Sequence, residues 1–261
     1  MRGARFEWVI LRRADLRRAF AADFAERLTG ATVLDVARRA KYLMVPLSTG
    51  DTLVMHLGMS GEFRIAPASS GFDADPASEP SAHDHVVFGM SSGWIVTFND
   101  VRRFGAMDLL SPAELSSHAT LATLGPEPLS RAFTADWLAA ACARRQAPLK
   151  AALLDQRVVA GLGNIYAVEA LHRAGISPFR AASSIATANG TPRSTAVRLV
   201  AAIRHVLRRA IARQTRGPYR SARFRAYDRE GLPCATPGCP GTIERRVQAG
   251  RSTFFCATCQ R

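Results

Sequence analysis

Lysine is nearly missing from this chain, although cations are abundant. Only Lys41 and Lys150 are lysines among 35 lysine and arginine residues, and these outnumber 21 acidic residues to give a formal net charge of +14. Such an excess attracts polyanions, because counterions are released when phosphates are neutralised. We rely on the charge and not on the Arg/Lys ratio, since an Ala- and Arg-rich chain can also reflect a GC-rich genome. The composition therefore predicts a polyanionic partner.

Long apolar segments are also missing. No run approaches the ~18 residues of a membrane-spanning helix, and the N-terminus lacks the charged start, apolar stretch and cleavage site of a secretory signal. We therefore expect a cytoplasmic protein without a membrane partner. The chain also has no G-x-S-x-G elbow, no H-E-x-x-H pair and no dinucleotide fingerprint, so these common enzyme chemistries are not indicated.

Cysteine is scarce, and four of the five cysteines lie near the C-terminus as a C-x4-C and a C-x2-C pair. They are Cys234, Cys239, Cys256 and Cys259. Two close pairs on facing turns of a hairpin supply the four soft ligands that tetrahedral Zn²⁺ prefers. Two disulfides of a secreted domain are the alternative, which is disfavoured because nothing else in the chain looks secreted. The pattern predicts one structural zinc ion. Cys142 is expected to be a small buried hydrophobic residue.

The first part of the chain predicts a sandwich of short strands rich in Val, Ile, Phe and Leu. Turn signals separate several of them, and one helix, Asp15–Leu28, interrupts the pattern. The expected strands are Phe6–Leu11, Thr32–Val36, Tyr42–Leu47, Leu53–Leu57, Glu62–Ile65, His85–Phe88 and Trp94–Phe98. A Pro/Ser/Ala-rich surface loop is expected over Pro67–Ala82.

Helices are predicted after a hinge-like break at Leu124–Leu129. They span Thr134–Ala143, Leu149–Leu154, Asn164–Ala174 and Ser194–Gln214, and the last has an apolar stripe expected in the core: Val197, Val200, Ile203, Leu207, Ala210 and Ile211. We expect an α+β multidomain fold. It comprises a two-layer β-sandwich at 1–115, a linker at 116–129, a helix–two-turn–helix domain at 130–222 and a zinc-finger β-hairpin at 223–261.

Each local motif has an ordinary alternative when taken alone. Asn164 begins a helix after a glycine-containing turn, where its side chain can cap the helix or reach a phosphate. Met59 is either core filler, which is favoured in isolation, or an exposed apolar wedge. Arg102 and Phe104 share a loop that suits groove binding with base stacking. For 83–85, a polar strand start or a phosphate contact is favoured over a metal pair.

The order of these motifs resembles that of the formamidopyrimidine-DNA glycosylase and endonuclease VIII family of base-excision repair enzymes, and is closer to the formamidopyrimidine branch. The matching segments are RRAKYL (38–43), HLGMSG (56–61), HDHV (83–86), VRRFG (101–105), LGPEPL (124–129), LLDQRVVAGLGNIYAVEAL (153–171), AGISP (174–178), YDREGLPC (227–234) and GRSTFFC (250–256). As a set they are highly specific.

The resemblance implies a bifunctional DNA glycosylase and AP lyase. Such an enzyme removes oxidised purines, namely 8-oxoguanine and formamidopyrimidines, from duplex DNA and nicks the strand by β,δ-elimination. It further implies one structural Zn²⁺, damaged double-stranded DNA as the partner, and a monomer associated with the bacterial nucleoid.

The resemblance also assigns roles to single residues. Lys41 matches a lysine that contacts phosphates at the lesion and donates a proton in β-elimination. Arg251 matches the zinc-finger arginine assigned to δ-elimination, and Glu169 an acidic residue beneath the active site. The remaining matches contact DNA: His56, His83, Lys150 and Asn164, with Met59, Arg102 and Phe104 filling the space left by the extruded base. Inserted side chains of this kind offset the stacking that base flipping loses.

Two departures from the family pattern stand out. The family nucleophile is an N-terminal proline, a secondary amine that attacks C1′ of the sugar, whereas this chain begins Met1-Arg2-Gly3 and aligns from the strand after the family's first helix. We expect that the start codon is assigned too late; the alternative is a truncated product that binds DNA weakly and does not cut it. The segment 215–226 is shorter than the family loop that covers the extruded purine, which leaves the lesion preference open.

Two other functions compete with the repair enzyme. A non-catalytic nucleic-acid-binding protein would use the same helix–two-turn–helix and zinc hairpin, and the missing proline favours it for the polypeptide as written. Retention of Lys41, Glu169 and Arg251 favours the enzyme. A zinc-stabilised ribosomal or structural RNA binder would explain the charge and the cysteines, but not the set of wedge residues.

Overall fold

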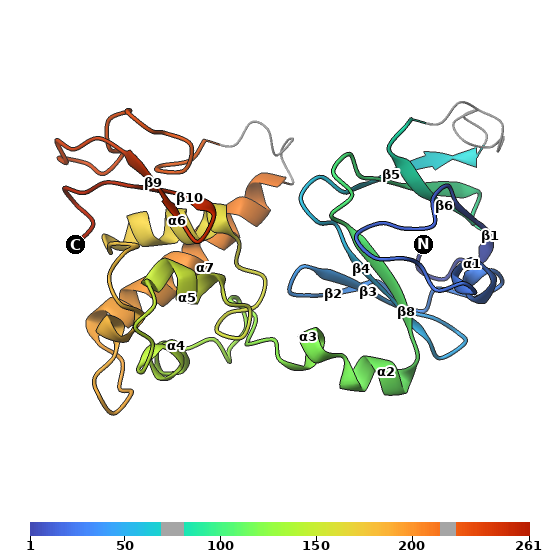
Figure 1. Ribbon diagram of the computed structural model, residues 1–261, viewed down its shortest axis with the longest axis horizontal. Helices are drawn as coiled ribbons and strands as arrows, with labels where there is room; N and C mark the ends of the chain where they lie inside the picture. The colour runs from blue at the N-terminus through green and yellow to red at the C-terminus, as the bar shows by residue number, and fades with distance from the viewer. Residues whose placement is uncertain (69–80, 215–222) are drawn as a thin grey trace. The chain divides into compact units, whose positions relative to one another are not determined.

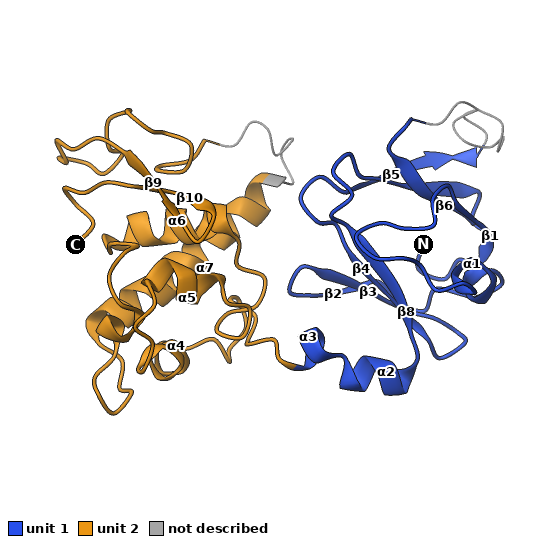
Figure 2. Ribbon diagram, viewed as in Figure 1, with its two compact units in different colours: residues 1–122 blue, residues 123–261 orange. Residues whose placement is uncertain are grey.

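The computed structural model describes residues 1–68, 81–214 and 223–261. The chain forms two compact units, Met1–Ala122 and Thr123–Arg261 (Figure 2). Their boundary falls within the segment 116–129 that the sequence predicts to be a linker. The predicted loops at 67–82 and 215–226 lie largely outside the described residues.

The first unit contains two four-stranded antiparallel sheets (Figure 1). One has the order β1-β6-β7-β5 and the other β2-β3-β4-β8. The strands are β1 (Phe6–Leu11), β2 (Ala37–Arg39), β3 (Tyr42–Pro46), β4 (Thr52–His56), β5 (Glu62–Pro67), β6 (Asp84–Met90), β7 (Trp94–Asn99) and β8 (Ala106–Leu110). The predicted β-sandwich is confirmed, and β1 has the predicted bounds.

The core of this unit lies between inward-facing side chains of both sheets. Val86, Phe88 and Met90 alternate along β6 and are buried in one cluster with Leu53 of β4, as the two-residue period of a strand requires. The rings of Phe6 and Phe88 meet edge to face at a centroid distance of 5.3 Å. Aromatic burial of this kind supplies much of the stability of a small sandwich.

Two predictions for the first unit are wrong. The predicted helix Asp15–Leu28 forms only at its end, as α1 (Phe24–Leu28). Asp15 and Ala19 pair as an isolated antiparallel bridge, and the Phe20 N–H donates to Ala14 O at 3.1 Å in place of the helical acceptor four residues back. The Arg17 N–H donates to Gly105 O at 3.0 Å, which holds this turn against a remote part of the chain. The predicted strand Thr32–Val36 is reduced to isolated bridges at its first two residues. The short elements β2, β8, α2 (Pro112–Ser117) and α3 (Ala119–Ala122) were not predicted.

The second unit is a helical bundle with a two-stranded hairpin. Its elements are α4 (Ala135–Cys142), α5 (Leu149–Leu154), α6 (Asn164–Ala174), the 3-10 helix η2 (Ala182–Ile185), α7 (Ser194–Gln214), β9 (Glu244–Gln248) and β10 (Arg251–Phe255). Cys142 is fully buried in this core, as predicted. Among the described helices, none combines the length and the hydrophobicity that a membrane crossing requires.

Helix α7 has the predicted bounds, and most of the predicted stripe lies on its buried face. Ala210 is buried, and Leu207 packs against the core. Val200 and Ile203 are in the core as expected, together with Leu199, which the stripe left out. Val197 and Ile211, by contrast, are each 54% exposed. The partners on α4 and α6 select which side of an apolar helix is covered, and periodicity alone cannot identify them.

The β9–β10 hairpin turns at Ala249 and Gly250, both with positive φ. This is the backbone that a two-residue hairpin turn needs to match strand twist. The hairpin rests on α6 through a small cluster that includes Val168 of α6, Ile243 and Phe254. Phe255 meets Phe179 edge to face at 4.7 Å. The hairpin therefore packs against the helix that begins at Asn164.

Candidate metal centre and nucleic-acid interface

The four C-terminal cysteines converge on one point. Their Sγ atoms all lie within 4.8 Å of one another. The Cys234–Cys259 and Cys239–Cys256 Sγ atoms are each 3.7 Å apart. Four sulfurs around a tetrahedral zinc ion, with Zn–S of about 2.3 Å, are about 3.8 Å apart. The donor set and its spacing therefore fit one structural Zn²⁺.

Neighbouring groups hold these sulfurs in place. Burial raises the pKa of Cys234, but hydrogen bonds from Thr236 and then His172 outweigh it and lower the pKa to about 6. The Cys256 backbone N–H donates to Gln260 Oε1 at 2.8 Å, and Gln260 Nε2 donates to Ile176 O at 3.0 Å, just beyond α6. The metal centre is thereby fixed to the end of α6.

In the first unit, buried Asp100 joins two loops. Its Oδ1 accepts from Ser60 Oγ at 2.5 Å and its Oδ2 from the Gly105 N–H at 2.7 Å. Ser60 Oγ in turn accepts from the Arg102 N–H at 3.0 Å. Asp100 is fully buried. Loops 57–61 and 99–105 are therefore held together by a carboxylate whose bonds are charge-assisted.

Gly58 brings the two loops into close approach. Its φ is +66°, and a Cβ at this position would collide with the Phe104 carbonyl group. Arg103 on the other loop also has positive φ, which is uncommon outside glycine and costs of order 1 kcal/mol. Such backbone strain persists only where the surroundings impose it, and here the Asp100 hydrogen bonds do so.

These two braced loops display the predicted wedge residues. Met59 is 70% exposed and Phe104 is 43% exposed. The Arg102 guanidinium carbon lies 5.0 Å from the centroid of the Phe104 ring. The core-filler alternative for Met59 is therefore wrong. The structure brings this trio together at one surface, with the apolar members facing solvent and a cation stacked beside them.

Lys41 and His56 are neighbours in the same unit. Lys41 is exposed and follows Ala40, which has positive φ. Tyr42 and His56 pair across β3 and β4, with their rings 5.1 Å apart. His56 Nδ1 accepts from the Gly58 N–H at 2.9 Å. Burial first, and then the charges of Lys41 and Arg17, lower the pKa of His56, so the neutral ring offers one N–H donor at Nε2.

The 83–85 segment contacts Asp100 through the His83 backbone and the His85 side chain. The His83 carbonyl accepts from the Asp100 N–H at 2.9 Å. His85 is buried, and its Nε2 lies 2.9 Å from Asp100 O. This arrangement places His83 at the start of β6 beside the Asp100 brace. A metal pair at 83–85 finds no support among the described residues, where the four cysteines form the group suited to a metal.

In the second unit, the carbonyl of Ser252 near the hairpin turn accepts two hydrogen bonds. Asn164 Nδ2 donates to it at 3.0 Å and Lys150 Nζ at 3.1 Å. Lys150 Nζ also donates to Thr253 Oγ1 at 2.6 Å. The N-cap of α6 is Gly163, without a side-chain cap bond, so the capping interpretation of Asn164 is wrong. Both side chains attach the hairpin to the helices.

Lys150 is enclosed, in contrast to Arg251. Lys150 is only 1% exposed, and burial first, then the charge of Arg251, lowers its pKa to about 8. Arg251 is exposed at the first position of β10, next to the hairpin turn. The exposed cation of this pair is therefore the arginine, and its guanidinium is suited to a phosphate.

Glu169 is buried within the second unit and bonds to backbone. Its carboxylate accepts from three consecutive N–H groups, Arg225, Ala226 and Tyr227, at 2.9, 2.8 and 2.9 Å. The residue is 5% exposed. Its two oxygens are thus occupied in holding the chain that leads into the zinc finger, which is a structural task.

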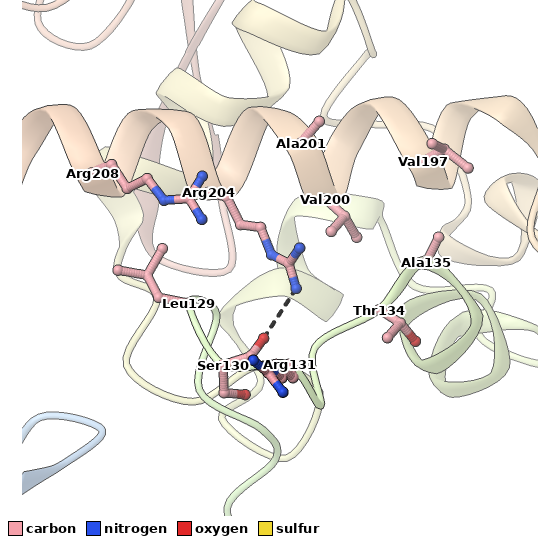
Figure 3. Close-up of a pocket in the computed structure, with 10 residues that line it drawn as sticks. All are labelled: Leu129, Ser130, Arg131, Thr134, Ala135, Val197, Val200, Ala201, Arg204 and Arg208. Atoms are coloured by element: carbon pink, nitrogen blue, oxygen red, sulfur yellow. Dashed lines mark hydrogen bonds between the residues drawn. The ribbon is translucent and has the colours of Figure 1, made fainter.

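A separate pocket lies in the second unit, between α7 and the segment before α4 (Figure 3). Arg204 reaches across it, donating to Ser130 O at 3.0 Å and to Phe133 O at 2.7 Å. The pocket has a volume of about 530 Å³ and is lined by Leu129, Ser130, Arg131, Thr134, Ala135, Val197, Val200, Ala201, Arg204 and Arg208. None of the predicted site residues lines it.

Sequence reasoning missed several residues that organise these surfaces. Asp100, Ser60 and Thr253 make the decisive bonds, and His172 contacts a zinc ligand. Asp100 had a usable signal, since it follows a buried strand directly and precedes the arginine loop. His172 had no such signal, because a histidine within a helical pattern does not indicate which residues of other elements its side chain contacts.

Comparison with protein families assigns most of the chain. Residues 1–107 match the formamidopyrimidine-DNA glycosylase N-terminal domain, and residues 124–220 match the formamidopyrimidine-DNA glycosylase H2TH domain. Residues 231–261 match a zinc finger found in FPG and IleRS. Together with the sulfur geometry, the last match establishes the four cysteines as a structural zinc site.

Relatives cover nearly the whole chain. The formamidopyrimidine-DNA glycosylase of Azorhizobium caulinodans is 55% identical over 277 residues, which cover 100% of this chain and 94% of that protein. Among solved structures, MutM (Fpg) of Thermus thermophilus is 36% identical with a TM-score of 0.79, covering 100% of this chain and 92% of that one. MutM in complex with DNA containing carbocyclic 8-oxo-G is 27% identical with a TM-score of 0.85, covering 100% and 94%. This chain therefore belongs to the formamidopyrimidine-DNA glycosylase family.

Proposed function

We propose that this protein is a base-excision repair DNA glycosylase with AP lyase activity, acting on oxidised purines in duplex DNA. The observation that carries the proposal is the exposed trio of Met59, Arg102 and Phe104 on two loops braced by Asp100. Solved relatives are bound to DNA containing carbocyclic 8-oxo-G or an abasic site. Family membership and this surface support the same substrate class.

The physical argument concerns base extrusion. Flipping a nucleotide out of a duplex loses a few kcal/mol of stacking, and the loss is smaller at a damaged pair. Large apolar side chains inserted into the gap restore contact with the neighbouring bases. Exposing Met59 and Phe104 to water is unfavourable without such a partner, since burial of the exposed part of each side chain would contribute roughly 0.6–2 kcal/mol of free energy. Rigid backing by Asp100 keeps them ready for insertion.

Contacts to the DNA backbone are proposed for exposed or partly exposed groups. In the first unit these are Lys41, His56 through Nε2–H, and His83. In the second unit they are Asn164 and Arg251, at the α6 N-terminus and the hairpin turn. Following the family resemblance, Lys41 donates a proton in β-elimination and Arg251 assists δ-elimination.

We assign Lys150 and Glu169 positioning tasks in place of direct DNA contact or catalysis. Lys150 is enclosed, and its ammonium is satisfied by Ser252 and Thr253. Glu169 is satisfied by three backbone N–H groups. Lys150 fixes the strand that begins with Arg251, while Glu169 fixes the entry to the zinc finger. Both assignments follow from burial and occupied hydrogen bonds.

The family resemblance assigns attack on C1′ to an N-terminal proline, which is not among the 261 residues of this sequence. The lesion-binding surfaces can be tested apart from that step.

We also propose that the protein works as a monomer on chromosomal DNA in the bacterial cytoplasm, since the curated relatives are bacterial.

The test compares binding of a duplex containing a tetrahydrofuran abasic analogue with binding of the undamaged duplex, measured by fluorescence anisotropy at fixed salt. We expect a preference for the lesion that falls about tenfold or more in Met59→Ala/Phe104→Ala, since about 1.4 kcal/mol of insertion energy corresponds to tenfold. Ile65→Ala is the matched control, because Ile65 is an apolar side chain of the same unit that is 61% exposed. Equal affinity of the unaltered chain for both duplexes would contradict the proposal, and a preference for structured RNA would favour an RNA binder.

A further inference from the structure

A buried histidine of the helical unit lies against a zinc ligand. His172, in the last turn of α6, is 2% exposed. Its Nε2 lies 3.3 Å from Cys234 Sγ, within hydrogen-bonding range for sulfur. Its Nδ1 is also buried and has no hydrogen-bond partner among the described residues. The ring therefore has one polar contact, and that contact is a metal ligand.

The direction of this hydrogen bond follows from the chemistry of the zinc site. A zinc-bound cysteine is a thiolate and carries no proton, so it can only accept. The proton of the bond must then reside on His172 Nε2. A ring with its proton on Nε2 is therefore the form that can bond to this ligand.

We propose that His172 is a positioning residue of the zinc centre, which donates Nε2–H to the Cys234 thiolate and so joins the metal to helix α6. A hydrogen bond to a thiolate disperses part of its negative charge and fixes the direction of its lone pairs. Outer partners of metal ligands commonly change metal affinity by about 10- to 100-fold. His172 acts from a different structural element than the hairpin that supplies the ligands.

The position of His172 gives this bond a mechanical consequence. Asn164, at the opposite end of α6, donates to Ser252 O near the hairpin turn. The helix thus holds the zinc finger at two points, one at the metal centre and one at the hairpin turn. The carboxylate of Glu169, between them along α6, holds residues 225–227. Loss of the His172 hydrogen bond should therefore loosen the zinc finger from the helix and also weaken zinc binding.

The most direct test uses the unaltered protein. Zinc is replaced with ¹¹³Cd, and the ring N–H of His172 is observed in ¹⁵N-histidine-labelled protein. We expect a scalar coupling between ¹¹³Cd and the His172 Nε2 proton, transmitted through Cys234 Sγ. Observation of a protonated Nδ1 and no proton on Nε2 would overturn the proposal, because the imidazole could then only accept.

Two variants test the effect on the metal. His172→Phe keeps a planar ring but removes the donor, whereas His172→Gln retains an N–H donor at similar reach. Chelator competition should show zinc affinity about 10- to 100-fold weaker in His172→Phe and closer to that of the unaltered protein in His172→Gln. In the cobalt-substituted proteins, the sulfur-to-metal charge-transfer band should move to lower energy in His172→Phe, because the thiolate loses its donor.

Arg173→Ala is the matched control, since Arg173 is the exposed neighbour on the same helix. Its zinc affinity and cobalt spectrum should equal those of the unaltered protein. Should His172→Phe not fold, the ¹¹³Cd measurement and the His172→Gln spectrum still decide. Unchanged zinc affinity and an unchanged cobalt band in folded His172→Phe would refute the proposal. These readouts depend on the zinc centre alone and are independent of glycosylase activity.

Discussion

Replacing Glu169 with glutamine separates a structural task from a catalytic one. Each charge-assisted hydrogen bond contributes about 1.5–3 kcal/mol, and Glu169 accepts three of them from Arg225, Ala226 and Tyr227. The amide oxygen of Glu169→Gln can still accept the two bonds to Oε1. Its NH₂ group would face the Arg225 N–H, so that donor loses its acceptor. We expect the attachment of residues 225–227 to α6 to weaken by about 2–4 kcal/mol, or roughly 30- to 1,000-fold in the equilibrium between attached and released states.

Hydrogen exchange of the amides of residues 225–227 measures this equilibrium directly. Their protection should fall by that factor in Glu169→Gln, while amides in the first unit, such as those of β6, keep their protection and serve as the internal control. Affinity for lesion-containing DNA should fall in parallel, because the zinc finger carries Arg251. The contradicting result is that Glu169→Gln keeps normal protection and DNA binding but abolishes strand cleavage when it is introduced into a cleavage-competent form of the protein. Glu169 would then have a catalytic role and not a structural one.

Three further predictions concern other parts of the molecule. The free energy of unfolding of the second unit, compared with that of Lys150→Met, should rise by up to about 3 kcal/mol between pH 8 and 10.5. The pKa of Lys150 is lowered from 10.5 to about 8, so in this range the unfolded chain holds a proton that the folded chain has lost. Urea titrations followed through Trp137, with both other tryptophans replaced, measure this difference, and a pH-independent difference would contradict the prediction. Gly58→Ala should lower the free energy of unfolding by about 1–3 kcal/mol more than Gly93→Ala does, as measured by thermal denaturation. Both glycines have positive φ, but only a Cβ at Gly58 collides with Phe104, so equal losses of stability would argue against the close loop contact. Cys256→Ala should lose zinc, by metal analysis, and DNA affinity together, and DNA binding that survives chelation unchanged would show that the zinc finger is not needed.

The parts of the fold that the sequence predicts well are those with a strong local signal. The bounds of α5, α6 and α7 are as predicted because their periodic apolar residues and glycine-containing boundaries agree. The region after β1 was mispredicted, since Arg17 bonds to Gly105, which is remote in sequence. On α7, Val197 and Ile211 were wrongly predicted to be in the core for a similar reason, because the extent of the buried face depends on partners that a single helix pattern does not contain.

The candidate site shows the same division. The cysteine spacing alone indicated the zinc site, and the family resemblance indicated Met59 and Phe104, which are exposed as a wedge requires. The resemblance could not distinguish a buried Lys150 from an exposed Arg251, because both are cations in matching motifs. Burial and hydrogen-bond partners make that distinction, and they arise from tertiary packing. The bond between His172 and Cys234 likewise joins elements far apart in sequence.

The central claim, a lesion-specific glycosylase and AP lyase of this family, is tested most directly by borohydride trapping on a duplex containing 8-oxoguanine. The 261-residue chain is compared with a form whose N-terminus carries a family-type segment beginning with proline. A covalent adduct with the proline-led form, and none with the 261-residue chain, is the predicted result, because a secondary amine at the terminus forms the iminium intermediate. An adduct with the 261-residue chain would identify another amine, with Lys41 as the first to be replaced. The absence of an adduct with either form would contradict the enzymatic assignment and favour a non-catalytic binder of damaged DNA.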